Sequence, residues 1–175
     1  MKAPIPKITF TQINQICIVV RDVRAAMRQY WDTVGIGPWK LYTVGGPDLS
    51  LAYMSYHGQS SRFKFYMALA NTENIQFELI QPLEGKTIYQ DFLDTHGEGV
   101  QHLGMAVDDI DQEMANAEAN GVAVIQWARG VGEGKRGHAY LDTEGCLHTT
   151  FEFIQKPGES SRPAPEPDEV YPEGM

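Results

Sequence analysis

The sequence contains an internal repeat, and this repeat constrains the fold more than any other feature. With a shift of 87 residues, segment 15–23 (QICIVVRDV) aligns with segment 102–110 (HLGMAVDDI). With a shift of 74 residues, segment 77–81 (FELIQ) aligns with segment 151–155 (FEFIQ). Such a repeat predicts two copies of one supersecondary unit, because a solenoid needs at least three copies. The length of 175 residues suits one domain built from two small units.

Each half is predicted to begin with a strand that is followed by a helix. Residues 13–20 form an apolar run, and Asp22 follows as a helix N-cap, with Gly35 as the helix terminator. The second half repeats this plan with a strand at 101–107 and Asp109 as the N-cap. Further strands are predicted at 38–44, 50–57, 62–69 and 74–81, then at 122–128, 137–141 and 147–155, with a short helix at 87–96 joining the halves.

Four polar side chains occupy matching strand positions in the two halves. Gln15 aligns with His102, and Glu78 aligns with Glu152. A carboxylate inside an apolar strand is costly unless it is paired or bound to a metal. The alternative is that both glutamates face solvent, that His102 is a hydrogen-bonded core histidine and that Gln15 is an edge residue. Because all four recur in matching positions, we favour one shared site.

The chemistry of these four residues suits a metal-assisted proton transfer. One imidazole, two carboxylates and one amide oxygen, without a thiolate, suit Zn, Ni, Co or Mn with open positions. Such a metal stabilises the enediolate that forms when a base removes a proton next to a carbonyl. Glu152 and Glu78 are candidates for ligand, base or both. His148 would share the strand face of Glu152 and is a candidate acid or base, with a rim position as the alternative.

The remaining histidine, cysteine and aromatic residues support weaker expectations. His138 is expected to be a strand or rim histidine. Cys17 and Cys146 predict neither a disulfide nor a thiolate zinc site, and both are expected to be small buried apolar residues. Aromatic residues such as Phe63 and Phe65 would line a cavity if their strands curve around a ligand, which predicts an apolar or aromatic substrate.

Composition excludes several classes of partner. The net charge of −9 argues against a nucleic-acid surface, which needs clustered basic side chains. No apolar run reaches the roughly 18 residues of a membrane helix, and the first residues do not resemble a signal peptide, so we expect a soluble cytoplasmic protein without a membrane partner. Residues 157–175 contain five prolines and several acidic residues, which predicts a disordered tail.

The segments that carry these features resemble the vicinal oxygen chelate superfamily. They are 15–22, 78–83, 99–109 and 151–155, and the resemblance extends over residues 13–156. It implies an α+β fold in which paired βαβββ modules form a cupped, mostly antiparallel sheet around a divalent metal. The expected organisation is an N-terminal extension at 1–12, a first module at 13–83, a linker with a short helix at 84–99, a second module at 100–156 and the tail at 157–175.

Two branches of the superfamily resemble different parts of this chain. The linker segment 83–99 is most similar to methylmalonyl-CoA epimerases, which usually have histidine at the first ligand position, where this chain has Gln15. The order Gln, Glu, His, Glu resembles the ligand set of eukaryotic glyoxalase. Val19, Glu98 and Pro82 stand where glyoxalase has glutathione-contacting residues. The resemblance therefore does not imply a glutathione thioester product.

The expected function is that of a metal-dependent isomerase, epimerase or lyase acting on a small apolar or aromatic substrate. Gln15 disfavours an extradiol dioxygenase, which needs two histidines and a carboxylate. One alternative is a metal-free ligand-binding or sequestering protein of the same fold. Another is a metal-free enzyme that uses His148 and Glu152 for acid and base catalysis. We also expect a homodimer, or an assembly within one chain in which edge strands are covered.

Overall fold

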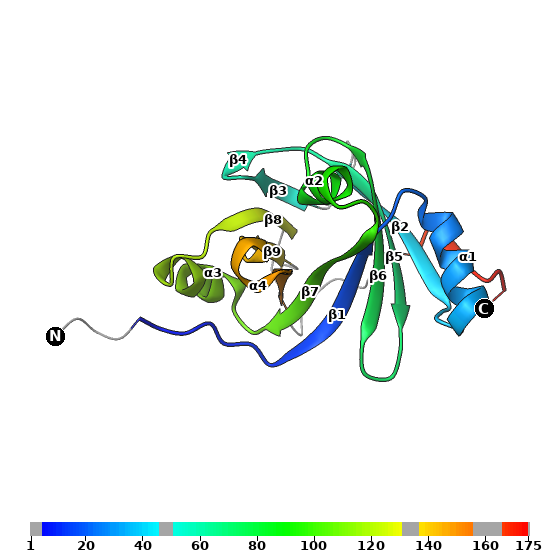
Figure 1. The fold of residues 1–175 in the computed structure, drawn as a ribbon, viewed down its shortest axis with the longest axis horizontal. Helices are drawn as coiled ribbons and strands as arrows, with labels where there is room; N and C mark the ends of the chain where they lie inside the picture. The colour runs from blue at the N-terminus through cyan, green and yellow to red at the C-terminus, as the bar shows by residue number, and fades with distance from the viewer. Residues whose placement is uncertain (1–4, 46–50, 131–136, 156–165, 175) are drawn as a thin grey trace.

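The structure is a computed structural model, and it describes residues 5–45, 51–130, 137–155 and 166–174. These residues form one 11-stranded sheet and four helices (Figure 1). The strands are β1 (Gln12–Val19), β2 (Trp39–Gly45), β3 (Leu51–Tyr56), β4 (Gln59–Ser60), β5 (Lys64–Asn71), β6 (Gln76–Glu84), β7 (Gly99–Val107), β8 (Val124–Gly130), β9 (Gly137–Leu141), β10 (Thr150–Gln155) and β11 (Glu169–Tyr171). The helices are α1 (Val23–Val34), α2 (Ile88–Thr95), α3 (Ile110–Ala119) and α4 (Glu144–Leu147).

The strand order shows that the two halves are equivalent modules. The sheet runs β11-β2-β5-β6-β1-β7-β10-β9-β8-β3-β4. In each half the first strand lies parallel to the last one, β1 beside β6 and β7 beside β10. The halves meet where β1 pairs antiparallel with β7. The expected α+β fold of paired modules with a mostly antiparallel sheet is therefore confirmed.

The first helix of each module begins at the aspartate that the sequence marks. Asp22 accepts a hydrogen bond from the Ala25 amide at 3.0 Å, and Asp109 accepts one from the Gln112 amide at 3.1 Å. Gly35 ends α1 with a φ of 72°, a backbone angle that favours glycine. None of the helices in the described part of the chain is long and apolar enough to cross a membrane.

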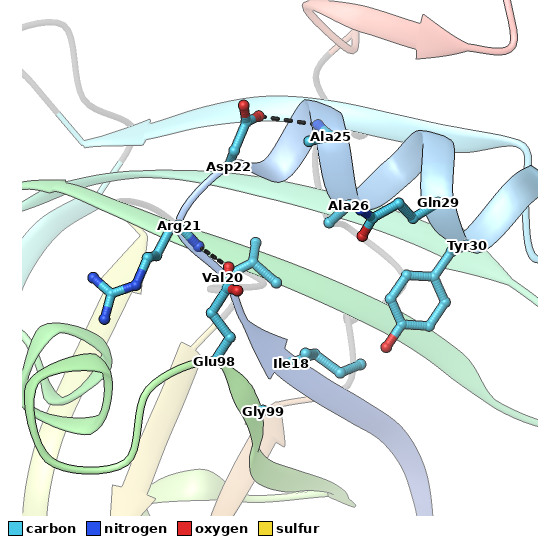
Figure 2. A pocket seen from close by; sticks show the side chains of 10 residues that line it. All are labelled: Ile18, Val20, Arg21, Asp22, Ala25, Ala26, Gln29, Tyr30, Glu98 and Gly99. Carbon is cyan, nitrogen blue, oxygen red and sulfur yellow. Dashed lines mark hydrogen bonds between the residues drawn. The ribbon is translucent and has the colours of Figure 1, made fainter.

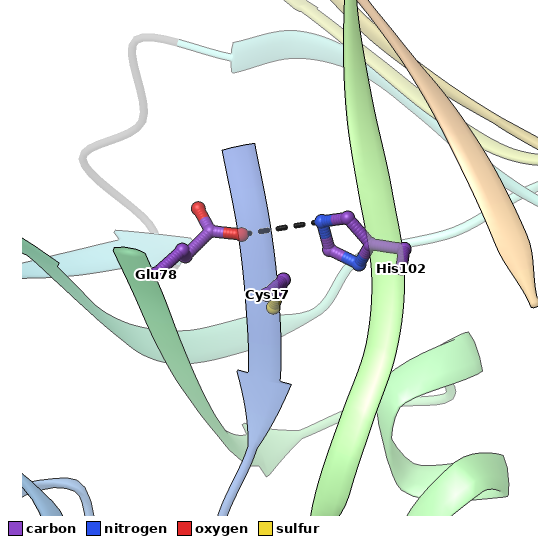
Figure 3. Close-up of side chains that lie close together, drawn as sticks. All are labelled: Cys17, Glu78 and His102. Atoms are coloured by element: carbon purple, nitrogen blue, oxygen red, sulfur yellow. Dashed lines mark ion pairs between the residues drawn. The ribbon is translucent and has the colours of Figure 1, made fainter. Parts of the chain in front are cut away.

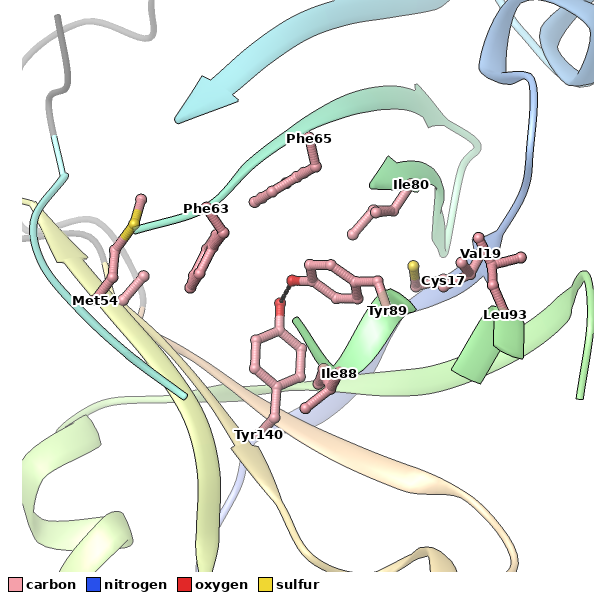
Figure 4. Packing of buried hydrophobic residues seen from close by; sticks show 11 residues of the cluster. Cys17, Val19, Met54, Phe63, Phe65, Ile80, Ile88, Tyr89, Leu93 and Tyr140 are labelled. Carbon is pink, nitrogen blue, oxygen red and sulfur yellow. Dashed lines mark hydrogen bonds between the residues drawn. The ribbon is translucent and has the colours of Figure 1, made fainter. Parts of the chain in front are cut away.

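The two faces of the sheet bury different partners. Because side chains alternate along a strand, Ile18 of β1 and Val20, directly after it, pack with α1 on the outer face. Cys17 and Val19 point to the opposite face, which we call the inner face. There α2 packs against the sheet through Ile88, Tyr89 and Leu93 (Figure 4). The joining helix thus covers the face that carries the candidate donors.

One strand of the first half crosses to the second half. The strand expected at 50–57 is present as β3, but it pairs with β8 rather than with β2 or β5. Together with β4 it forms a hairpin at the far end of the sheet (Figure 1). The first module therefore contributes the strand that covers the edge of the second module.

The expectation of a disordered tail is wrong for residues 166–174. Strand β11 pairs antiparallel with β2, and the Asp168 amide donates to the Leu41 carbonyl at 2.8 Å. Arg24 forms an ion pair with Glu169 at 2.7 Å. The edge of β2 offers backbone groups for pairing. The three residues of β11 pair with this edge although the surrounding segment is rich in proline. The part of the predicted tail at 157–165 lies outside the described residues.

Candidate metal centre

The pairing of strands brings the four predicted donors into two adjacent rows on the inner face. In one row Glu78, Cys17 and His102 are neighbours across β6, β1 and β7. In the other row Gln15 and Glu152 flank Gly104 across β1, β7 and β10. Residues two apart on a strand share a face, so both rows point the same way. Residues at matching positions of the sequence repeat therefore lie close together in the structure.

The convergence is close and fully enclosed. His102 Nε2 lies 3.3 Å from Glu78 Oε2 and 3.2 Å from Glu152 Oε2. The exposed fractions of Gln15, Glu78, His102 and Glu152 are 5%, 4%, 0% and 1%. Two carboxylates from different halves therefore face one imidazole nitrogen in a region that excludes water.

One atom of each predicted donor lacks a hydrogen-bond partner among the described residues. These atoms are Gln15 Oε1, Glu78 Oε2, His102 Nε2 and Glu152 Oε2. The two short contacts to His102 Nε2 have ion-pair distances but not hydrogen-bond geometry. Buried polar atoms are normally paired, so four such atoms in one place need a common explanation. A divalent cation fits them, because oxygen and imidazole nitrogen are its usual ligands.

Neighbouring side chains hold three of the donors so that the free atom faces the centre. Gln15 Nε2 donates to Gln76 at 2.8 Å, which leaves Oε1 free. His102 Nδ1 donates to the Gln101 side-chain oxygen at 2.6 Å, which turns Nε2 toward the two carboxylates. His138 Nδ1 donates to Glu152 Oε1 at 2.7 Å, which leaves Oε2 free. Such partners fix tautomer and orientation in known metal sites.

Gly104 provides the space between the two halves. A Cβ at this position would lie 2.9 Å from Gln15 Cβ, 3.0 Å from Gln15 Oε1 and 2.5 Å from Ile154 Cδ1. Each of these separations is too short for a real side chain without a shift of the neighbours. The absence of a side chain at Gly104 therefore lets the Gln15 amide reach the centre.

The charges at the centre favour a cation. Burial acts to lower the pKa of His102, but the charges and contacts of Glu152 and Glu78 outweigh it and raise the pKa to about 9. For Glu152, burial acts to raise the pKa, and the interactions with His102 and His138 lower it. The negative potential that holds a proton on His102 also attracts a metal ion, so proton and metal compete for Nε2.

The structure places the two other histidines that the sequence marks. His138 is a hydrogen-bonded strand histidine, as expected, because it lies in β9 and bonds Glu152 while its own side chain is 38% exposed. His148 is exposed and has a φ of 59°, which agrees with the alternative of a rim position and not with a place on the inner face beside Glu152. The difference has a local cause, because α4 interrupts the predicted strand and β10 begins only at Thr150.

Cys17 lies at the centre itself. Atoms of Cys17, Glu78 and His102 that can bind a metal all lie within 4.8 Å of one another (Figure 3). Cys17 is fully buried, as expected, and burial followed by the charge of Glu78 raises the pKa of its thiol. Cys146 is exposed, which corrects the expectation that both cysteines are buried.

Aromatic side chains cover the centre on the inner face. The hydroxyl groups of Tyr89 and Tyr140 are hydrogen-bonded at 2.7 Å (Figure 4). The Tyr140 ring packs edge-on against His102, with 5.0 Å between the ring centroids. Phe65 in turn packs edge-on against Tyr89. The surroundings of the donors are therefore aromatic, with one pair of hydroxyl groups among the rings.

A pocket of about 420 Å³ lies elsewhere, between α1 and the start of β7 (Figure 2). Ile18 and Val20 of the outer face line it, together with Tyr30 and Gly99. Its lining includes none of the four donors, and Glu98 at its rim already accepts a hydrogen bond from the Arg21 amide at 2.6 Å. We therefore place the functional site at the buried donors.

Comparison with known proteins identifies the family. The family profile described as the glyoxalase/bleomycin resistance protein/dioxygenase superfamily matches residues 14–140. The chain belongs to this superfamily, which confirms the vicinal oxygen chelate resemblance. No curated protein sequence matches the chain.

Solved structures share this fold at low sequence identity. Methylmalonyl-CoA epimerase from Mycobacterium tuberculosis has a TM-score of 0.60 and 20% identity, and the match covers 91% of each chain. A variant of the Streptomyces coelicolor methylmalonyl-CoA epimerase, in complex with 2-nitronate-propionyl-CoA, has a TM-score of 0.59 and 20% identity over 85% of this chain and 99% of that one. A hypothetical protein from Bacillus halodurans C-125 has a TM-score of 0.58 and 18% identity over 86% of this chain and 98% of that one.

Proposed function

We propose that this chain is a metal-dependent isomerase or epimerase that removes a proton next to a carbonyl group. The observation that carries the proposal is the group of four buried donor atoms without partners. A buried donor or acceptor without a hydrogen bond costs about 1–3 kcal/mol, and among these four atoms only the ion-pair contacts of His102 Nε2 with Glu78 and Glu152 offset that cost. A bound divalent cation would satisfy all four at once.

Gln15, Glu78, His102 and Glu152 would hold this metal. When bound, the metal supplies Lewis-acid stabilisation for negative charge that develops on a carbonyl oxygen. The oxygen and nitrogen donors of these four residues suit Zn, Ni, Co or Mn. The same residues leave no pair of histidines for an oxygen-activating iron centre, which supports proton transfer over dioxygen chemistry.

Glu152 and Glu78 are suited to move the proton. Their Oε2 atoms approach His102 Nε2 from different strands, at 3.2 Å and 3.3 Å. Carboxylates from two sides could remove a proton from a carbon and return one to its opposite face, which inverts that carbon. His138 orients Glu152 through Oε1, and Oε2 would accept the proton when it leaves the metal. This arrangement favours epimerisation over a lyase reaction, which stays the alternative.

The surroundings and the similar structures suggest where a substrate search should begin. Aromatic residues on the inner face, including Phe65 and Tyr140, favour an apolar group beside the reacting carbon. Two of the similar structures are methylmalonyl-CoA epimerases, so a branched acyl thioester is the first class of compound to test. A homodimer and a cytoplasmic location stay predictions.

The proposal is tested with metal analysis and isotope exchange. Protein purified without chelator should contain close to one divalent metal per chain, and removal of the metal should abolish turnover. In D2O, methylmalonyl-CoA or another accepted thioester should gain deuterium at the carbon next to the carbonyl. Glu152→Gln should slow this exchange by about two orders of magnitude or more if Glu152 is the base. Oxygen uptake that matches product formation would instead show a dioxygenase.

Two other functions predict different outcomes in the same experiments. A metal-free ligand-binding protein would contain no stoichiometric metal and would exchange no substrate hydrogen. A metal-free acid and base enzyme would keep full activity after chelation and would use His148 and Glu152 as its acid and base. Because His148 is exposed, its position does not support a metal-free acid and base enzyme.

A further inference from the structure

The floor of the candidate metal centre contains a thiol that the oxygen and nitrogen donor set does not include. Cys17 is the middle residue of the row Glu78, Cys17, His102, so its side chain rises between a carboxylate and an imidazole. It is 0% exposed. Apolar packing alone would explain a buried cysteine, as the sequence suggests.

The neighbours of Cys17 argue for more than packing. Its Sγ lies within 4.8 Å of both a Glu78 carboxylate oxygen and a His102 ring nitrogen, and these two atoms also lie within 4.8 Å of each other. Glu78 Oε2 and His102 Nε2 form an ion pair at 3.3 Å but have no hydrogen-bond partner among the described residues, and both side chains are more than nine-tenths buried. Figure 3 shows the three side chains converging from three adjacent strands. A purely apolar role would not need two polar atoms without hydrogen bonds beside the sulfur.

We propose that Cys17 is an additional ligand of the metal centre and that it makes the centre prefer Zn or Co over Mn. This inference rests on the metal binding proposed above. In the binding step the S–H bond breaks, a bond forms between sulfur and metal, and the proton leaves to solvent, with no change of oxidation state. Thiolates favour Zn over ions such as Mn, which prefer oxygen donors. Cys17 would therefore narrow the choice among the four candidate metals.

Cobalt(II) alone is a suitable probe, because its spectrum reports its ligands directly. The full-length chain, stripped of metal and kept without oxygen, is titrated with cobalt chloride. Ligand-field bands in the visible range report that Co(II) has entered a protein site. A charge-transfer band in the near ultraviolet reports a thiolate on the cobalt. The chain has only two cysteines, so the source of such a band can be assigned with two variants.

The matched variants are Cys17→Ala and Cys146→Ala, because Cys146 is exposed, whereas Cys17 is the cysteine grouped with Glu78 and His102. The native chain and Cys146→Ala should show both kinds of band. Cys17→Ala should keep the ligand-field bands through the oxygen and nitrogen donors and lose the charge-transfer band. Cys17→Ser, which preserves size, serves as a second variant if the alanine variant does not fold.

Competition between metals gives an independent measurement. In Cys17→Ala the ratio of Zn affinity to Mn affinity should fall by roughly 10–100-fold or more. A change of this size in metal affinity is typical when a residue that only supports a metal ligand is removed. Ligand-field bands without a charge-transfer band in the native chain would overturn the role of Cys17 and leave the metal centre intact. No cobalt bands at all would overturn the metal centre itself. A charge-transfer band that disappears only in Cys146→Ala would also refute the inference.

Discussion

The two modules contribute equivalent positions to the centre but different chemistry. The first module offers the neutral amide of Gln15, and the second offers the imidazole of His102 at the aligned position. Each module adds one glutamate, but only Glu152 has a histidine bonded to its second oxygen, at 2.7 Å. The two modules therefore offer equivalent positions, and in the proposed centre the second module would supply the nitrogen ligand and the carboxylate that a histidine supports.

The outer edges of the two modules are covered by different segments of the chain. Both modules would end in an exposed strand, β2 in the first and β8 in the second. The edge of β8 is covered by β3, which comes from the first module. The edge of β2 is covered by β11, which comes from the last residues of the chain. Edge strands need such protection against association, and here each module receives it from outside its own repeat.

The largest effect should come from the aligned pair Gln15 and His102. His102→Ala removes the nitrogen ligand that lies between both carboxylates, and we expect it to lower metal affinity by more than roughly 100-fold. Gln15→Ala removes a weaker neutral donor, and we expect about a tenfold loss, or about 1.4 kcal/mol. Metal affinity is measured by titration of the stripped protein. His96→Ala is the control, because that histidine is half exposed and pairs with Glu144. Equal losses in the Gln15 and His102 variants would show that the modules contribute equally.

A smaller effect should separate the two histidines near Glu152. His138→Ala frees Glu152 Oε1, and we expect activity or metal affinity to fall roughly 10–100-fold. His138→Gln can still donate a hydrogen bond to the carboxylate and should recover part of this loss. His148→Ala should leave both quantities nearly unchanged, because His148 is exposed outside the strand. If His148→Ala lowered activity and metal affinity as much as His138→Ala does, the loss in His138→Ala would not be due to its hydrogen bond with Glu152.

The elements and the donor set could be predicted because the repeat encodes both. Strand periodicity and the aspartate caps locate β1, α1, β7 and α3, and the aligned segments bring the four donors onto one face. Neither inference requires knowledge of strand order. In the structure one buried atom of each predicted donor has no hydrogen-bond partner among the described residues, and the same holds for Asn14 Oδ1 and Trp39 Nε1.

Features that depend on strand neighbours could not be predicted. His138 reaches Glu152 because β9 pairs with β10, and Cys17 lies between Glu78 and His102 because β1 lies between β6 and β7. No local pattern reports these neighbours. His148 was misplaced for a different reason. Thr143 accepts a hydrogen bond from the Phe151 amide at 3.1 Å and donates one to the Thr149 carbonyl at 2.9 Å, and this local loop delays the strand.

The smallest expected effect concerns the covered edge of the first module. Arg24 and Glu169 tie α1 to β11, but their side chains are 41% and 36% exposed, and solvent weakens such a pair. We expect Glu169→Gln to lower the free energy of unfolding by less than about 1 kcal/mol. Arg24→Met should cost more, because the guanidinium also lies 4.9 Å from the centre of the Tyr66 ring. Urea unfolding of both single variants and the double variant isolates the ion pair, whose contribution should shrink in high salt. A loss above 2 kcal/mol for Glu169→Gln would mean that this contact, rather than backbone pairing with β2, holds β11 in place.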